Sequence, residues 1–239
     1  MVSLILASQI LVQAPAQSPA AMVSKMLARY SSAKALYGTI TFRQTFEQNK
    51  SEIQTYVQFQ RPDKLYIRQT KLGDPKVNIT AADGQLVTYE VPPNSLSKPG
   101  QRMYEPQWRN GIQSIIQEVY TAASASLIDR SPALDILIGK KEYLKFRAEQ
   151  LATVGWLNDT APAAGQSGVI VGNWREYPRA DVSGKYSLSI TSDGDLARYQ
   201  VQESIVLPGE RNPKLVVSDW SLSIKVGEPG DLNLYKVKR

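Results

Sequence analysis

The stretch Thr-Ile-Thr-Phe-Arg-Gln-Thr-Phe, residues 39–46, decides the fold class of this chain. Apolar Ile40, Phe42 and Phe46 alternate in it with polar residues, and side chains two positions apart lie on the same face of a strand. The alternation repeats in three following runs, 52–59, 64–68 and 76–80. We therefore expect successive antiparallel strands that turn one face away from water.

Parity along these runs predicts which side chains lie on the apolar side of the sheet. In the run 76–80 it selects Val77 and Ile79 and leaves Asn78 and Thr80 on the polar side. An Asp-Gly pair at 83–84 then predicts a tight hairpin into the next strand. Over the strands up to residue 149, the expected lining consists of Ile40, Phe42, Phe46, Val57, Phe59, Leu65, Ile67, Val87, Tyr89, Val91, Leu144 and Phe146.

Three segments have the spacing of helices instead. The first follows Ser18-Pro19, the second lies within residues 110–127, and the third runs from Ser131-Pro132 to Gly139. Serine before proline is typical of a helix start, and glycine of a helix end. Alternating strands resume at residue 143 and continue to residue 226, with a second Asp-Gly hairpin at 193–194. Roughly ten or eleven strands, with helices only at the start and in the middle, predict an α+β fold.

Composition excludes most catalytic arrangements, because the chain has no histidine and no cysteine. Ser-His-Asp and Cys-His sites and disulfides are impossible, and zinc or copper would lack its best ligands. The Ser31-x-x-Lys34 spacing stands without its companion motifs, and Asp193 and Asp195 flank a hairpin glycine, where aspartate serves the backbone. We expect no enzyme activity, no metal and no cofactor.

A net charge of +6 raises the possibility of nucleic-acid binding. The basic residues are spread along the strands, often opposite the apolar side. Even the densest cluster, within residues 140–147, is interleaved with Glu142 and followed by Glu149. A solvated sheet face is the simpler interpretation, so we expect no nucleic-acid partner.

The first sixteen residues have features of an export signal. An apolar stretch from Leu4 to Val12 precedes Ala14-Pro15-Ala16, which matches a small-x-small cleavage site. We expect cleavage before Gln17, a single domain over residues 17–239, and a periplasmic or otherwise exported protein. The alternative is an apolar N-terminal helix packed on the domain.

Between residues 21 and 235 the chain resembles the LolA-like superfamily of outer-membrane lipoprotein carriers and lipoprotein-sorting proteins. The resemblance rests on the order of elements, on the segment Gln-Arg-Pro-Asp-Lys-Leu-Tyr-Ile at 60–67, on the hairpin at 83–84 and on Tyr89 ahead of prolines. It implies an incomplete, strongly curved β-barrel whose concave face is covered by helices, with an apolar cavity for acyl chains. The lid-locking arginine of the carriers is not assigned to Arg43, which lies on the polar parity of its strand.

The resemblance also implies that the middle helices act as a lid over that cavity. The lid residues are Ile112, Ile115, Ile116, Leu134, Ile136, Leu137 and Ile138. The expected function is that of an exported, monomeric carrier or binder of lipid or lipoprotein acyl chains, served by membrane-bound donor and acceptor proteins. An envelope sensor or protein-binding scaffold on the same fold is the alternative, and a basic nucleic-acid binder is a third hypothesis.

Overall fold

One antiparallel sheet contains every strand of the residues that the computed structural model describes, namely 18–91, 100–104, 115–129, 131–139, 155–163, 165–175, 183–206, 209 and 211–237. Its eleven strands lie in the order β6-β5-β4-β3-β2-β1-β11-β10-β9-β8-β7. Their bounds are β1 Ala35–Phe46, β2 Asn49–Gln60, β3 Lys64–Lys71, β4 Val77–Asp83, β5 Val87–Val91, β6 Gly100–Tyr104, β7 Gly155–Trp156, β8 Gly168–Arg175, β9 Ser183–Ile190, β10 Leu196–Ile205 and β11 Lys214–Val226.

Pairing between β1 and β11 joins the two arms of the sheet, the N-terminal arm β1–β6 and the C-terminal arm β7–β11. Within each arm, strands that follow one another in the sequence pair as antiparallel neighbours. The joint places Phe42 opposite Trp220. The two rings stack with their centroids 4.9 Å apart, so an aromatic contact lies at the centre of the sheet.

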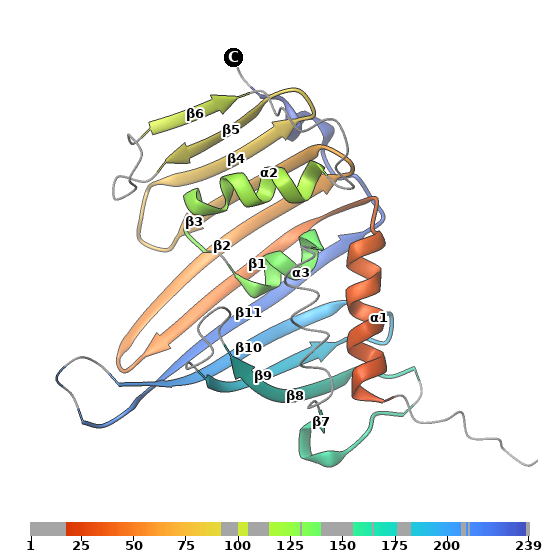
Figure 1. Cartoon of the computed structure of the whole chain (residues 1–239), viewed down its shortest axis with the longest axis vertical. Helices are drawn as coiled ribbons and strands as arrows, with labels where there is room; N and C mark the ends of the chain where they lie inside the picture. Colours follow the sequence, from red (N-terminus) through yellow and green to blue (C-terminus); the bar gives the residue numbers. More distant parts are fainter. Residues whose placement is uncertain are drawn as a thin grey trace, which may run out of the picture.

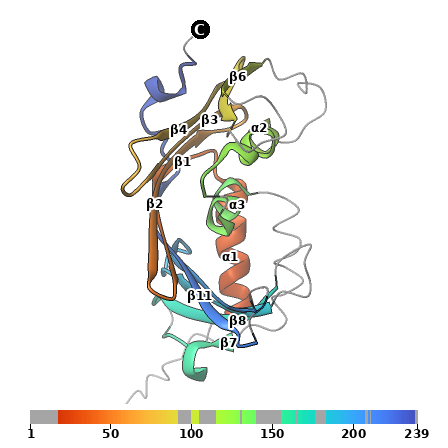
Figure 2. The same cartoon turned by 90° about the vertical axis from the view of Figure 1, so that its left-hand side faces the viewer.

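The sheet bends into an open arc, and the helices lie inside it (Figure 2). They are α1 Pro19–Ser32, α2 Ile115–Ala123 and α3 Pro132–Ile138, with a 3-10 turn η1 Ser124–Ser126 between the last two. In Figure 1 all three helices lie in front of the strands, while β6 and β7 form separate outer edges. The predicted α+β class and the open, curved sheet with helices on its concave face are confirmed.

The helix ends follow the sequence signals closely. Ser18 and Ser131 are N-caps, whose hydroxyl oxygens accept hydrogen bonds from Ala21 N (3.2 Å) and Leu134 N (3.1 Å). Gly139 ends α3 at φ 73°, a left-handed conformation in which glycine has no steric penalty. The middle helix ends earlier than predicted, because α2 stops at Ala123 and the chain tightens into η1. There the hydroxyl of Ser126 donates a hydrogen bond to Ala123 O (2.7 Å).

Polar contacts attach α1 to the C-terminal arm. Arg29 Nε lies 2.6 Å from Asp195 Oδ1, and this contact raises the pKa of Arg29. Tyr30 is fully buried, and its hydroxyl accepts a hydrogen bond from Leu196 N (2.9 Å). Burial raises the pKa of the Tyr30 hydroxyl. These contacts fix α1 against the β9–β10 hairpin.

The predicted parity is wrong for β4. Asn78 and Thr80 are buried, whereas Val77 and Ile79 are 37% and 40% exposed. The inward parity of this strand also includes Ala82, which packs in the concave core. The physical reason is that η1 meets the concave face here with a backbone carbonyl, and Asn78 Nδ2 donates a hydrogen bond to Ser126 O.

The convex face carries a small apolar cluster of its own, so both faces of the sheet bury apolar side chains. Tyr66, Ala81 and Tyr235 are buried together there. A C-terminal 3-10 turn, η4 Leu232–Tyr235, covers them, and Gln58 Nε2 donates to Asp231 O at 2.7 Å. Burial raises the pKa of Tyr235 to about 12. Figure 2 shows this tail outside the arc, opposite the helices.

Candidate ligand-binding face

The concave face brings together most of the lining residues that parity predicted. Seven of them are at most 9% exposed and belong to one hydrophobic cluster: Ile40, Phe42, Val57, Phe59, Leu65, Ile67 and Val87. Tyr89 packs against the same cluster, and Phe46 is half-buried at the end of β1. The side chain of Val91, at the end of β5, lies outside the described residues, as do Leu144 and Phe146.

The predicted lid residues pack into that same cluster from the opposite side. Five of them are at most 1% exposed: Ile116, Leu134, Ile136, Leu137 and Ile138. Ile115 is partly buried against the cluster, and Ile112 lies outside the described residues. The side chains of α2 and α3 therefore cover the predicted lining residues of the sheet.

A turn between β2 and β3, residues 61–63, fastens all three helices to the sheet. Arg61 Nε donates to Ala33 O after α1 (2.9 Å), and its Nη2 donates to Ile138 O at the end of α3 (2.6 Å). Pro62 O accepts from Ile116 N of α2 (2.7 Å). Burial lowers the pKa of Arg61, whose guanidinium lies 4.9 Å from the centre of the Phe59 ring.

Sequence reasoning did not assign a role to Arg61. Its proline neighbour marked a turn, but the carbonyl groups that the guanidinium binds come from segments about 28 and 77 residues away. Arg43 has no comparable role. It forms an exposed ion pair with Glu52 (2.8 Å) on the convex face.

A polar patch interrupts the apolar concave face where β2, β3 and β4 meet the connection from η1 to α3. We define it as Thr55, Gln69, Asn78, Thr80, Ser126 and Asp129, all of which are buried. Gln69 is its centre. The Nε2 of Gln69 donates to Thr55 Oγ1 and to Asp129 O, both at 2.9 Å, and its Oε1 accepts from Ile128 N at 2.7 Å.

Asp129 places a carboxyl group in this patch. Its Oδ2 accepts a hydrogen bond from Trp220 Nε1 (3.2 Å), and the carboxyl also accepts a hydrogen bond from the hydroxyl of Ser131. Burial raises the pKa of Asp129 to about 7, against the opposing effect of these two hydrogen bonds. The group lies inside the layer that joins α2 and α3 to the sheet.

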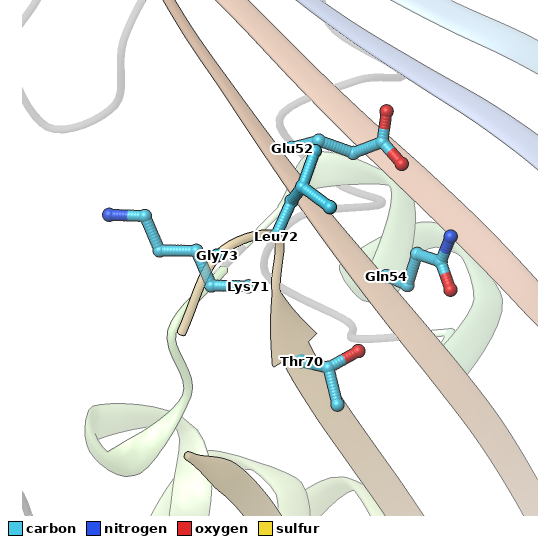
Figure 3. A pocket seen from close by; sticks show the side chains of 6 residues that line it. All are labelled: Glu52, Gln54, Thr70, Lys71, Leu72 and Gly73. Atoms are coloured by element: carbon cyan, nitrogen blue, oxygen red, sulfur yellow. The ribbon is translucent and has the colours of Figure 1, made fainter. Parts of the chain in front are cut away.

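One hollow on the convex face has a volume of about 700 Å³ and crosses β8, β9 and β10, with Val169, Lys185 and Arg198 among its lining. A smaller one, of about 220 Å³, lies at the β2–β3 end. Figure 3 shows Glu52, Gln54 and Thr70 projecting toward it from neighbouring strands. On the concave face, side chains of α1, α2 and α3 pack against those of the sheet in one hydrophobic cluster.

The catalytic candidates remain apart from this face. Ser31 donates its hydroxyl hydrogen to Ala28 O within α1 (3.1 Å), and Asp195 is paired with Arg29. The described residues contain no group of three or more acidic, histidine or cysteine side chains placed to hold a metal ion. Within the same ranges, no helix combines the length and the apolar character needed to cross a membrane.

No protein-family model and no curated protein matches this chain. Solved structures that resemble it include the MucA/MucB complex of Pseudomonas aeruginosa, at 11% identity over 92% of this chain with a TM-score of 0.40. This chain spans 60% of the length of that matched chain.

Two further structures match over nearly their whole length. LprF from Mycobacterium bovis has 9% identity and a TM-score of 0.42, and covers 91% of this chain and 97% of its own. A LolA superfamily protein from Nitrosomonas europaea has 11% identity and a TM-score of 0.30, over 88% and 94%. With identities of 9–11% and TM-scores below 0.5, these likenesses carry no argument about family, ligands or partners.

Proposed function

We propose that this protein binds the acyl chains of lipids or lipoproteins on the concave face of its sheet, and that α2 and α3 are a lid that leaves this face when ligand enters. As a carrier it would be exported, act as a monomer, and exchange cargo with membrane-bound donor and acceptor proteins. The observation that carries the proposal is the shared hydrophobic cluster. One side of it belongs to a continuous sheet, and the other belongs to short helices fastened by a few polar contacts.

The energetics favour a lid that competes with the ligand. Burial of about ten methylenes at roughly 0.8 kcal/mol each would contribute about 8 kcal/mol, enough to retain a cargo too tightly. The side chains of Leu134 and Ile138 are fully buried when the face is empty. They must give up this burial when ligand enters, which lowers the net affinity and permits release.

A binding assay tests this proposal. The delipidated protein is titrated with a fluorescent fatty acid, and lauroylglycerol is then added as competitor. We expect saturable binding that lauroylglycerol displaces and glycerol does not. Phe46→Asp places a charge at the half-buried end of the concave face and should weaken binding. Thr45→Asp, exposed on the opposite face of β1, is the matched control. Absence of binding, or equal binding by both variants, refutes the proposal.

Protein binding on the same fold is the second candidate, and the 700 Å³ hollow on the convex face favours it. Apolar Val169 and Val171 line it together with charged Lys185 and Arg198, so a partner protein could make both apolar and charged contacts there. A partner protein that purifies with the chain, with no lipid in the extract, would support this function. Lipid identified by mass spectrometry without a partner would support the first.

Export is part of the proposal, and it has a test of its own. The segment expected to be removed lies outside the described residues. Sequencing the N-terminus of the mature protein should find Gln17 first. A retained residue 1 in the native protein would contradict export by cleavage.

A further inference from the structure

Two buried polar atoms on β4 have no hydrogen-bond partner. They are Asn78 Oδ1 and Thr80 Oγ1, on side chains that are 6% and 0% exposed. Both side chains point to the concave face, since they share the parity of Ala82 in the concave core. A buried polar atom without a partner is destabilising, and folded proteins contain few of them. These two therefore require an explanation.

The orientation of β4 runs against the hydrophobic effect. The strand exposes Val77 and Ile79 to solvent while it buries Asn78 and Thr80. The convex face gains only in part from this choice, because Ala81 packs there while Val77 and Ile79 remain over one-third exposed. The hydrogen bond to Ser126 O accounts for the buried Nδ2 of Asn78, but it does not account for the burial of Asn78 Oδ1 and Thr80 Oγ1.

Register places these side chains beside further polar groups. Asn78 is opposite Gln69, and Gln69 is opposite Thr55 on the next strand. In the closed state the amide of Gln69 is engaged by Ile128 and Asp129, and Asn78 Nδ2 by Ser126 O. All these partners belong to the connection between α2 and α3. If that connection moves with the lid, both amides lose these partners together, and Gln69 Nε2 keeps only its hydrogen bond to Thr55 Oγ1 on the sheet.

We propose that Gln69, Asn78 and Thr80 bind the ester or amide linkage of an acyl ligand after the lid has moved. Their amide and hydroxyl groups can donate to a carbonyl oxygen and accept from a neighbouring hydroxyl or N–H. Apolar Ile67, directly opposite Thr80, would contact the adjoining hydrocarbon. This inference rests on the proposed function and narrows its ligand to acyl chains joined to a hydrogen-bonding group, in contrast to bare hydrocarbon.

The substitution Thr80→Val tests this proposal, because it removes the hydroxyl and keeps the shape. We expect the dissociation constant for lauroylglycerol to rise roughly three- to ten-fold, the effect of one neutral hydrogen bond. The thermal midpoint should stay or rise, because the hydroxyl has no partner in the closed state. Thr80→Ser restores the hydroxyl and should bind within about two-fold of the wild type. Thr45→Val, exposed on the convex face, should change neither quantity.

Each other outcome has a distinct meaning. Wild-type affinity in Thr80→Val overturns this inference and leaves the proposed function standing. A lowered midpoint in Thr80→Val, or weak binding by Thr80→Ser, also overturns it, because the hydroxyl or the methyl would then serve the fold. Failure of the wild-type protein to bind lauroylglycerol overturns the proposed function and the inference together.

Discussion

Asp129 makes the stability of the protein depend on pH. Burial raises its pKa from 3.8 to about 7, while in the unfolded chain the pKa is ordinary. As pH rises from about 4 to about 7, the unfolded state therefore loses this proton first, and stability falls. Relative to Asp129→Asn, the free energy of unfolding of the wild type should fall by up to about 4 kcal/mol over this range. Urea unfolding at a series of pH values measures it, and parallel curves for the two proteins would exclude the effect.

Arg61 is the residue on which the attachment of the helices depends most. Arg61→Ala would leave the carbonyl groups of Ala33 and Ile138 without this donor and remove the contact with Phe59. We expect a loss of about 2–4 kcal/mol in the free energy of unfolding, because two buried carbonyl groups lose a charged donor. Amide exchange in α3 should also become faster.

A matched control for Arg61 is Arg43→Ala. Arg43 is 61% exposed and pairs with Glu52 on the convex face. Exposed pairs contribute roughly 0–1 kcal/mol, so this variant should stay within that range. If Arg61→Ala and Arg43→Ala lowered the free energy of unfolding equally, the hydrogen bonds of Arg61 to the helix ends would contribute no more to stability than an exposed ion pair.

At the scale of elements, the lid helices should compete with ligand through their apolar side chains. Ile115→Ser on α2 weakens the packing of the empty lid, because Ile115 packs partly buried against the cluster. We expect tighter retention of lauroylglycerol, measured as slower dissociation. Glu118→Ser, exposed on the same helix, should leave the dissociation rate unchanged. Faster dissociation from Ile115→Ser would indicate that this side chain holds the ligand instead.

Elements were predictable where local chemistry determines them. Ser131 and Gly139 mark the ends of α3 through hydrogen bonds and backbone conformation that neighbouring residues supply. The orientation of β4 was not predictable, since it depends on Ser126, which arrives from a distant segment. The end of α2 was missed although its cause is local, because the apolar helical spacing continues to Leu127 while serine side chains after Ala123 bond back to the chain and tighten it into η1.

At the scale of the whole molecule, alternation predicted strands and Asp-Gly turns predicted hairpins, but neither contains the β1–β11 pairing that joins the arms. Parity likewise predicted most of the concave lining. It missed the roles of Arg61 and Gln69, whose partners are defined only after the helices dock. The convex cluster under η4 was missed because Tyr66 alternates with apolar residues and was expected in solvent.

The decisive measurement is hydrogen–deuterium exchange of the whole chain with and without saturating lauroylglycerol. If the acyl chain replaces the lid, amides of α2 and α3 should exchange faster when ligand is bound, while β1, β2 and β3 keep or increase their protection. Replacement of the lid would be refuted if the exchange rates of α2 and α3 stayed unchanged and new protection appeared only along β8, β9 and β10 at the convex hollow.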